Sequence, residues 1–148
     1  MSSANLAGTT SQPSWAGVAR AARRAGWLGA GLAALALGGL EVVNHGPWAL
    51  AGLITLAIAP DLTFLKGMGQ ASQMEPGQLP AVAVPWYNAA HRPWVPALLL
   101  VTCVVTPLSW APLFAAGLGW LAHIALDRAM GFGLRTADGF QRDGHGHR

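Results

Sequence analysis

Two carboxylates and two imidazoles stand out in a sequence that is otherwise strongly apolar: Asp61, His91, His123 and Asp127. His123 and Asp127 are spaced i, i+4, so both side chains share one face if their segment is helical. Carboxylate oxygens and imidazole nitrogens are ligands of Zn²⁺, Mn²⁺ and Fe²⁺ in proteins. These residue types predict one divalent metal ion bound by the four side chains.

Two further polar residues are expected to support this site. Asn88 stands at i−3 from His91, so the two share a face if that stretch is helical. Arg128 follows Asp127 directly, and its guanidinium could hold an anionic group such as a lipid phosphate. A divalent ion lowers the pKa of a bound water and makes it a nucleophile, so the expected chemistry is metal-assisted hydrolysis.

Each of these residues also has a structural interpretation, and the sequence leaves both open. Asp61 could cap or kink a helix, and His123 could donate one hydrogen bond across helices. Asp127 could pair with Arg92 or Arg128 as a structural ion pair.

The composition points to a membrane. Of the 148 residues, 53% are hydrophobic and 10% are charged, against roughly 25% charged residues in an ordinary soluble domain. So small a soluble protein needs more polar side chains to cover its surface, and disorder requires low hydrophobicity and high charge. The chain is therefore expected to be a small integral membrane protein.

Four apolar segments are long enough to cross a bilayer, which takes about 20 helical residues, whereas a barrel strand needs about 9–11 residues of alternating polarity. The predicted fold is all-α, an integral membrane bundle of four transmembrane helices. The predicted spans are 25–43, 48–65, 94–110 and 112–134. They form a transmembrane domain over residues 20–136, between a flexible N-terminal tail (1–19) and a polar C-terminal tail (137–148).

The basic residues predict the orientation. They precede the first span, flank the polar connection at 66–92, or lie at or after the end of the fourth span, and the two short turns contain none. The positive-inside rule then places both termini in the cytoplasm. The same dispersal argues against nucleic-acid binding despite the net charge of +3. As an alternative, Arg23-Arg24 and the following apolar run could be a cleaved secretory or twin-arginine signal, although the run is long for a signal core.

Depth connects the polar residues. At a rise of about 1.5 Å per residue, Asp61 lies towards the cytoplasmic end of the second span. His123 and Asp127 lie in the cytoplasmic half of the fourth span, and His91 lies just before the third. Polar groups at such depths are costly and are functional candidates. Three segments thus bring their unusual residues to one level.

Four stretches of sequence resemble small bacterial membrane proteins grouped as domain-of-unknown-function family 4260: Ala59–Leu62, Tyr87–His91, Leu118–Arg128 and Gly131–Arg135. The resemblance covers roughly residues 51–140. The chain departs from the pattern at Phe132, where a tyrosine is usual, and at its end, which lacks the usual Thr-His-Leu. The resemblance implies a multi-pass protein of the bacterial cytoplasmic (inner) membrane, but no reaction.

The leading functional hypothesis is a metal-dependent membrane hydrolase acting on a lipid-linked or amphipathic substrate, with membrane lipid as its partner. A second hypothesis is a small proton-coupled transporter, in which the same histidines and aspartates relay protons. A third is a non-catalytic structural or accessory subunit. The glycine-rich helices could also pack between chains, so a homo-oligomer is compatible with the sequence.

Overall fold

The computed structural model describes residues 14–107 and 110–142. Within them the protein is helical and has no strand, only an isolated β-bridge between Arg135 and Gln141. The all-helical prediction is therefore confirmed. The elements are α1 (Trp15–His45), α2 (Pro47–Ile58), the 3₁₀ helix η1 (Ala59–Gln73), α3 (Val84–Ala90), α4 (Trp94–Val105) and α5 (Ala111–Met130).

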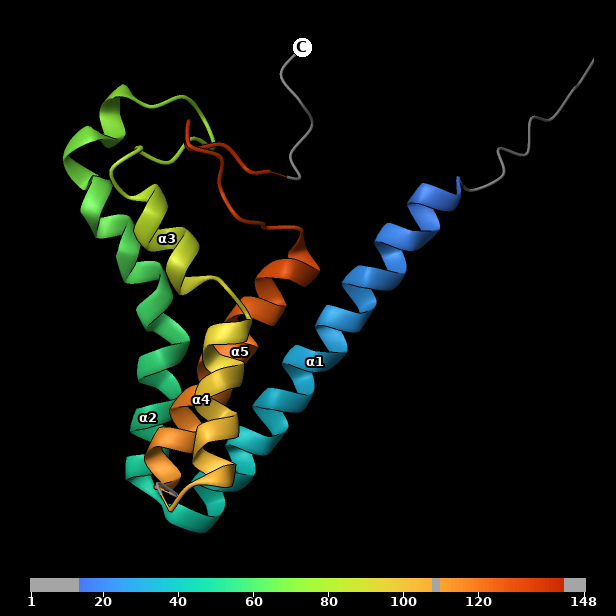
Figure 1. The fold of residues 1–148 in the computed structure, drawn as a ribbon, viewed down its shortest axis with the longest axis vertical. Coiled ribbons are helices and arrows are strands. Elements are labelled where there is room, and N and C mark those ends of the chain that lie inside the picture. Colours follow the sequence, from blue (N-terminus) through green and yellow to red (C-terminus); the bar gives the residue numbers. More distant parts are fainter. Residues whose placement is uncertain (1–13, 108–109, 143–148) are drawn as a thin grey trace, which may run out of the picture.

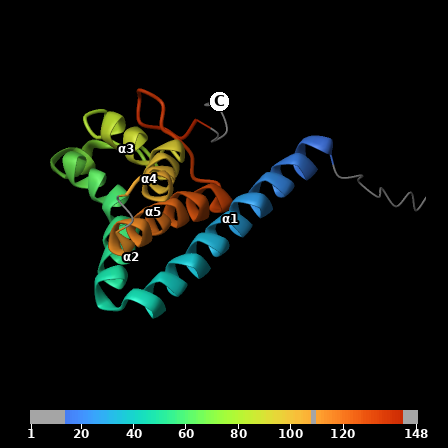
Figure 2. The same ribbon diagram turned by 60° about the horizontal axis from the view of Figure 1, so that its bottom comes forward.

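The helices run back and forth between two ends of the molecule (Figure 1). The α1–α2 corner, the end of α4 and the start of α5 lie at the lower end of this view. The start of α1, η1, α3 and the end of α5 lie at the upper end. Helix α5 packs against α1, α2 and α4, and Figure 2 shows it beside α1 and α2. It is therefore the central helix of the bundle.

Small residues let α2 and α5 approach each other closely. A side chain at Gly119 of α5 would collide with the carbonyl oxygen of Leu53, and one at Gly52 of α2 would collide with the carbonyl oxygen of Pro112. Close backbone contact between glycines is a common way for apolar helices to pack. The neighbouring core is formed by Ala34, Leu118 and Ala122, with Leu53, Leu100 and Phe114 packed against them.

Helix α1 begins earlier than the predicted domain boundary at residue 20. The side chain of Ser14 accepts a hydrogen bond from the Gly17 N–H, which caps the helix inside the segment predicted as a tail. Residues 1–13 of that predicted tail lie outside the described part of the chain. At the other end, Gly46 adopts φ 73° and Pro47 follows as the first residue of α2.

The boundaries of the later helices differ from the predicted spans at prolines and one glycine. Because Pro60 has no N–H to donate, the α-helical pattern of α2 stops before it, yet the chain continues as η1 past the predicted end at residue 65. With α3, this makes much of the predicted connection helical. Helix α4 stops at Val105 rather than residue 110, since Thr106 is extended before Pro107. Helix α5 ends at Gly131, which has φ 96°.

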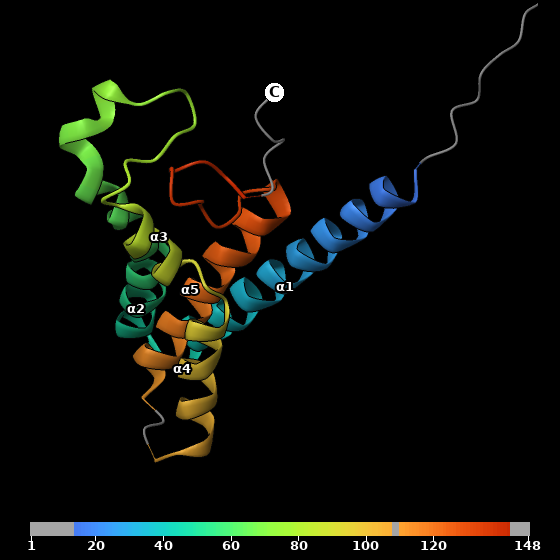
Figure 3. The same cartoon turned by 45° about the horizontal axis from the view of Figure 1, so that its top comes forward.

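The start of the predicted polar C-terminal tail, residues 137–142, is held by hydrogen bonds to an earlier part of the chain. The Leu79 N–H donates to the Gly139 carbonyl at 3.0 Å, and the Gln78 side chain donates to the Asp138 carbonyl at 2.9 Å. Gly139 has φ 91°, and a side chain there would collide with the Leu79 carbonyl. In Figure 3 this segment forms a loop next to the end of α5. Residues 143–148 lie outside the described part.

Two helices are long and apolar enough to cross a membrane: α1, and α2 continued through η1. Only 17% of the most apolar window of α1 and 11% of that of the second helix are buried inside the protein. Most of their apolar side chains thus face away from the bundle, unlike those of a core helix of a soluble protein.

Candidate metal centre

The four predicted site residues come from three segments of the chain: the α2–η1 junction, the end of α3, and α5. Asp61 follows Pro60 at the junction of α2 and η1, and His91 is the residue that ends α3. His123 and Asp127 lie one turn apart on α5. The register of α2 against α5 brings these residues to one level. Leu53 stands eight residues before Asp61, and Gly119, which contacts Leu53 closely, stands four and eight residues before His123 and Asp127.

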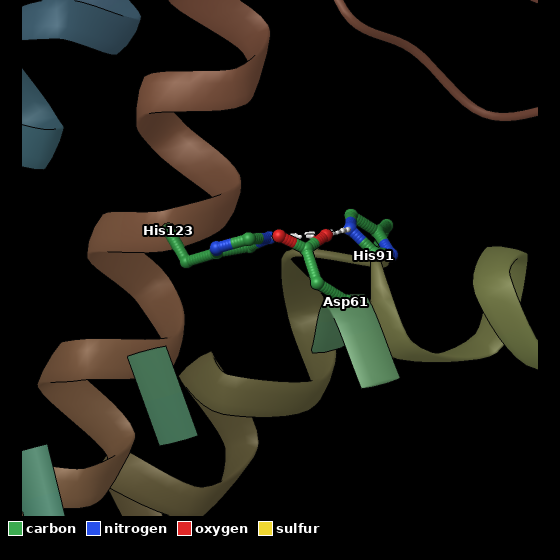
Figure 4. A group of neighbouring side chains, drawn as sticks. All are labelled: Asp61, His91 and His123. Carbon is green, nitrogen blue, oxygen red and sulfur yellow. Dashed lines mark hydrogen bonds and ion pairs between the residues drawn. The ribbon is translucent and has the colours of Figure 1, made fainter. Parts of the chain in front are cut away.

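The side chains meet with their ligand atoms facing one another. Nε2 of His91 lies 3.2 Å from Nε2 of His123. From Oδ1 of Asp61 the two nitrogens lie at 3.7 and 3.5 Å, and from Oδ2 of Asp127 at 3.5 and 3.6 Å. Figure 4 shows the Asp61 carboxylate between the two imidazoles. The ligand atoms of Asp61, His91 and His123 therefore all lie within 4.8 Å of one another, and Oδ2 of Asp127 lies within 3.6 Å of both imidazole nitrogens.

These separations fit a metal ion. In a tetrahedral site with ligand distances of about 2.0–2.2 Å, neighbouring ligand atoms lie about 3.3–3.6 Å apart. The two imidazole nitrogens form a triangle with either carboxylate oxygen, with edges of 3.2–3.7 Å, within ~0.1 Å of that range. Such a triangle supplies three of the four ligands of a tetrahedral site and leaves the fourth position open. Two neutral imidazoles and two carboxylates would carry a charge of −2, which a divalent cation balances.

The tautomer of His91 also suits a ligand. Its Nδ1 lies 2.9 Å from the carbonyl oxygen of Tyr87, which can only accept, so Nδ1 carries the proton and Nε2 presents a lone pair to the cluster. Burial lowers the pKa of His91, and the hydrogen bond to Tyr87 opposes this effect. A histidine that donates its other N–H to a carbonyl is the usual arrangement at metal sites.

Neighbouring residues hold the backbone and ring of His91 in place. The Tyr87 ring stacks on the imidazole with centroids 3.8 Å apart. The Arg128 guanidinium donates to the His91 carbonyl at 3.3 Å, and the Trp120 indole N–H donates to the Ala90 carbonyl at 2.8 Å. Tyr87 of α3 thus packs against one face of the imidazole, while Trp120 and Arg128 of α5 hold the backbone of Ala90 and His91.

The cluster is closed on one side and open on the other. The side chains of His91, His123 and Asp127 are 3%, 13% and 19% exposed, whereas that of Asp61 is 50% exposed. Any small molecule that reaches the cluster therefore arrives past Asp61.

The structure brings together all four residues proposed as ligands. The supporting residues are placed differently from the expectation: Asn88 lies outside the cluster and pairs with the backbone of Arg135, at 2.7 and 2.9 Å. Arg128 contacts the His91 carbonyl. Within the described residues Asp127 forms ion pairs with the two histidines and none with an arginine, which disagrees with the structural ion pair considered above.

Sequence reasoning about the site overlooked Tyr87 and Trp120. Tyr87 is the only tyrosine of the chain and stands at i−4 from His91, where a helix places its carbonyl and ring against the imidazole. Trp120 stands at i−3 from His123, one turn before it on α5. These spacings are the signals that could have identified both residues.

The chain belongs to the family described as Domain of unknown function (DUF4260), which matches residues 27–147. The match confirms the resemblance found in the sequence and extends it to most of α1. It covers all four residues of the cluster. Neither the curated proteins nor the solved structures contain a match to the chain.

Proposed function

We propose that the protein is a four-span membrane protein that binds one divalent metal ion at its cytoplasmic end and uses it to hydrolyse an amphipathic substrate. The observation that carries this proposal is the convergence of Asp61, His91, His123 and Asp127 from three separate segments, with nitrogen and oxygen atoms 3.2–3.7 Å apart.

The membrane placement is supported by where apolar side chains lie. Large apolar residues along α1 and α2 are exposed, for example Leu32 at 55%, Leu40 at 57% and Ile58 at 53%. In water this surface would be strongly unfavourable, at about 25 cal/mol per Å². A bilayer removes that cost, and the four crossings are assigned to the predicted spans. Helix α4, with 12 residues, measures about 18 Å and would require local thinning of the bilayer.

The cytoplasmic orientation is supported by the charges at the two ends of the bundle. The start of α1, η1, the α3–α4 junction and the end of α5 lie towards one end (Figure 1), and the eight Lys and Arg residues of the described part of the chain occur in or beside these segments. The α1–α2 corner carries none. Because α1 packs on α2 and α5 and its residues from Trp27 match the family, we assign it to the mature protein rather than to a cleaved signal.

The chemistry follows from the burial pattern. The two histidines and Asp127 are the enclosed ligands, while Asp61 stands at the open side. A divalent ion held by His91, His123 and Asp127 would keep a fourth position open on the side of Asp61, where it would polarise a substrate oxygen or lower the pKa of a bound water. The Asp61 carboxylate lies within reach to accept the proton of that water. A cluster at the end of the spans, rather than in their middle, gives water and a lipid-like substrate access together.

The first experiment measures the metal content of the full chain purified in detergent, treated with chelator and reloaded with Zn²⁺ or Mn²⁺. We expect one ion per chain, lost in the His91→Ala, His123→Ala double variant. The ion should be retained in the control His45→Ala, which removes a histidine at the end of α1, away from the cluster. A reloaded protein without metal, or a double variant that keeps its metal, contradicts the proposal.

A second measurement separates hydrolysis from the other hypotheses. Metal-loaded protein in mixed micelles is incubated with dilauroyl phosphatidylglycerol, and release of fatty acid, glycerol or glycerol phosphate is followed, with Asp61→Asn as the variant. Release that depends on metal and on Asp61 supports the hydrolase. A pH-driven flux in liposomes that Asp61→Asn abolishes favours the proton-coupled transporter, and a change in stability alone favours the structural subunit.

A further inference from the structure

Four arginines line one cavity beside the end of α5. Arg20, Arg23 and Arg24 come from α1 and Arg128 comes from α5, and the cavity has a volume of about 360 Å³. None of the lining residues is acidic. The Arg24 guanidinium also lies against Gly131, where a side chain would approach its Nη2 to 2.6 Å. The cavity is distinct from the metal cluster, although Arg128 contacts both.

In the part of the chain that the structure describes, none of these arginines forms an ion pair with a carboxylate. Asp127 acts on Arg128 only at longer range. Arg128 donates only to the His91 carbonyl, which is neutral. Like charges held near one another are unfavourable unless an anion joins them. Guanidinium groups bind oxyanions through paired hydrogen bonds, and a phosphate offers more oxygens than a carboxylate to the several guanidinium groups around this cavity.

An apolar groove continues from the arginine cavity along the same side of the bundle. It has a volume of about 440 Å³ and is lined only by apolar residues of α1, α4 and α5. On α1 the lining passes from Arg23 and Arg24 through Trp27 to Ala33 and Leu37. These positions recur at helical spacing, so they lie on one face.

Helix α5 shows the same order. Its lining residues run from Arg128 at the cavity to Leu121, Leu118 and Phe114 in the groove, again at spacings of three, four or seven. The arginine cavity and the apolar groove therefore lie end to end. The charged part is at the end of the bundle that carries the basic residues, and the apolar part is at the depth of the spans.

We propose that this surface binds one anionic phospholipid, with its phosphate among Arg20, Arg23, Arg24 and Arg128 and one acyl chain in the groove between α1 and α4. Charge complementarity selects a headgroup with net negative charge, and the apolar continuation selects one that carries a hydrocarbon chain. The inference rests on the membrane placement in the proposed function, but it does not rest on the metal.

The test titrates the full chain in detergent with phosphatidylglycerol or phosphatidylcholine of equal chain length and measures bound lipid by native mass spectrometry. We expect one phosphatidylglycerol to bind saturably. Phosphatidylcholine should bind with an affinity at least about tenfold lower. The Arg23→Gln, Arg24→Gln double variant should weaken phosphatidylglycerol binding about tenfold or more, because charge-assisted hydrogen bonds are lost. The matched double variant Lys66→Gln, Arg142→Gln should stay within about twofold, since its charges lie outside the cavity.

A second variant tests the groove even if the arginine variant folds poorly. Ala33→Phe adds bulk to the groove and should weaken long-chain phosphatidylglycerol while leaving the dihexanoyl lipid unaffected. Equal binding of phosphatidylcholine, equal loss in the Lys66 and Arg142 variant, or full competition by inorganic phosphate would overturn the proposal. Metal content is measured on the same samples: lipid binding without metal defeats only the metal site, and metal without lipid binding defeats only this inference.

Discussion

Two histidine–acid pairs in the described part of the chain have the same local spacing and very different surroundings. Glu41 and His45 lie one turn apart at the end of α1, and His123 and Asp127 lie one turn apart on α5. In each pair an i, i+4 spacing on a helix brings the two side chains together. His45 Nδ1 is 3.1 Å from Glu41, and His123 Nε2 is 3.6 Å from Asp127.

The pairs differ in what else reaches them. The His45 side chain is 49% exposed, and its Nδ1 also faces the carbonyl of Glu41 in its own helix. The pair on α5 is mostly enclosed and is joined by Asp61 and His91 from two other segments. The comparison teaches that i, i+4 spacing on one helix is enough to bring a histidine and an acid together. A set of metal ligands also requires that other segments of the chain place their side chains beside that pair. Here those ends are the break at Pro60 and the end of α3.

The largest expected effect contrasts the two acids. Asp127→Asn should lower Zn²⁺ affinity by more than about 100-fold, since loss of a ligand exceeds the effect of losing an outer partner. Glu41→Gln should leave it unchanged within about twofold. Isothermal titration with Zn²⁺ measures both, and similar affinities for the two variants would remove the distinction drawn between the pairs.

The next effect tests the packing that aligns the ligands. Gly119→Ala places a methyl group against the Leu53 carbonyl and should cost about 1–3 kcal/mol of unfolding free energy, because α2 and α5 must separate. Zn²⁺ affinity should fall with it. Gly29→Ala is the control, since nothing lies within 4 Å of a side chain there. Thermal unfolding of both variants measures the difference in stability. Equal stability of the two would show that the close approach of α2 and α5 at Gly119 does not stabilise the fold.

A smaller effect is expected from the ring beneath His91. Tyr87→Leu removes the stacked ring but keeps the carbonyl that accepts from Nδ1, so Zn²⁺ affinity should fall about tenfold, as for other outer partners of metal ligands. The neighbouring exposed residue offers the control Trp86→Leu, for which we expect no change in affinity. A loss equal in both variants would assign the effect to α3 as a whole.

The smallest effect concerns the exposed pair itself. His45→Ala should change the unfolding free energy by less than about 1 kcal/mol, because exposed ion pairs contribute little. Its metal content should equal that of the unchanged chain. A larger destabilisation in a denaturation experiment would show that the α1 end has partners beyond Glu41 and would weaken the contrast.

Much of the fold follows from local sequence. The helical class is set by long apolar segments, and Gly46-Pro47, Pro107 and Gly131 mark ends that short-range backbone chemistry explains. The folding of residues 137–142 was not foreseen, because it depends on Leu79 and Gln78 far back in the chain. The start of α1 was placed too late, since the cap at Ser14 outweighs a composition typical of a tail.

What the sequence determined by itself was the level of each polar residue along its helix. Depth depends on one length, the rise per residue, so counting places Asp61, His123 and Asp127 near the same end. Only the tertiary structure decided how each helix is rotated and what each side chain meets. Asn88 and Arg128 stand at suitable positions, yet they turn to the backbone of Arg135 and His91. Rotation is set by packing between helices, such as Gly119 against Leu53, and a single segment contains no information about that contact.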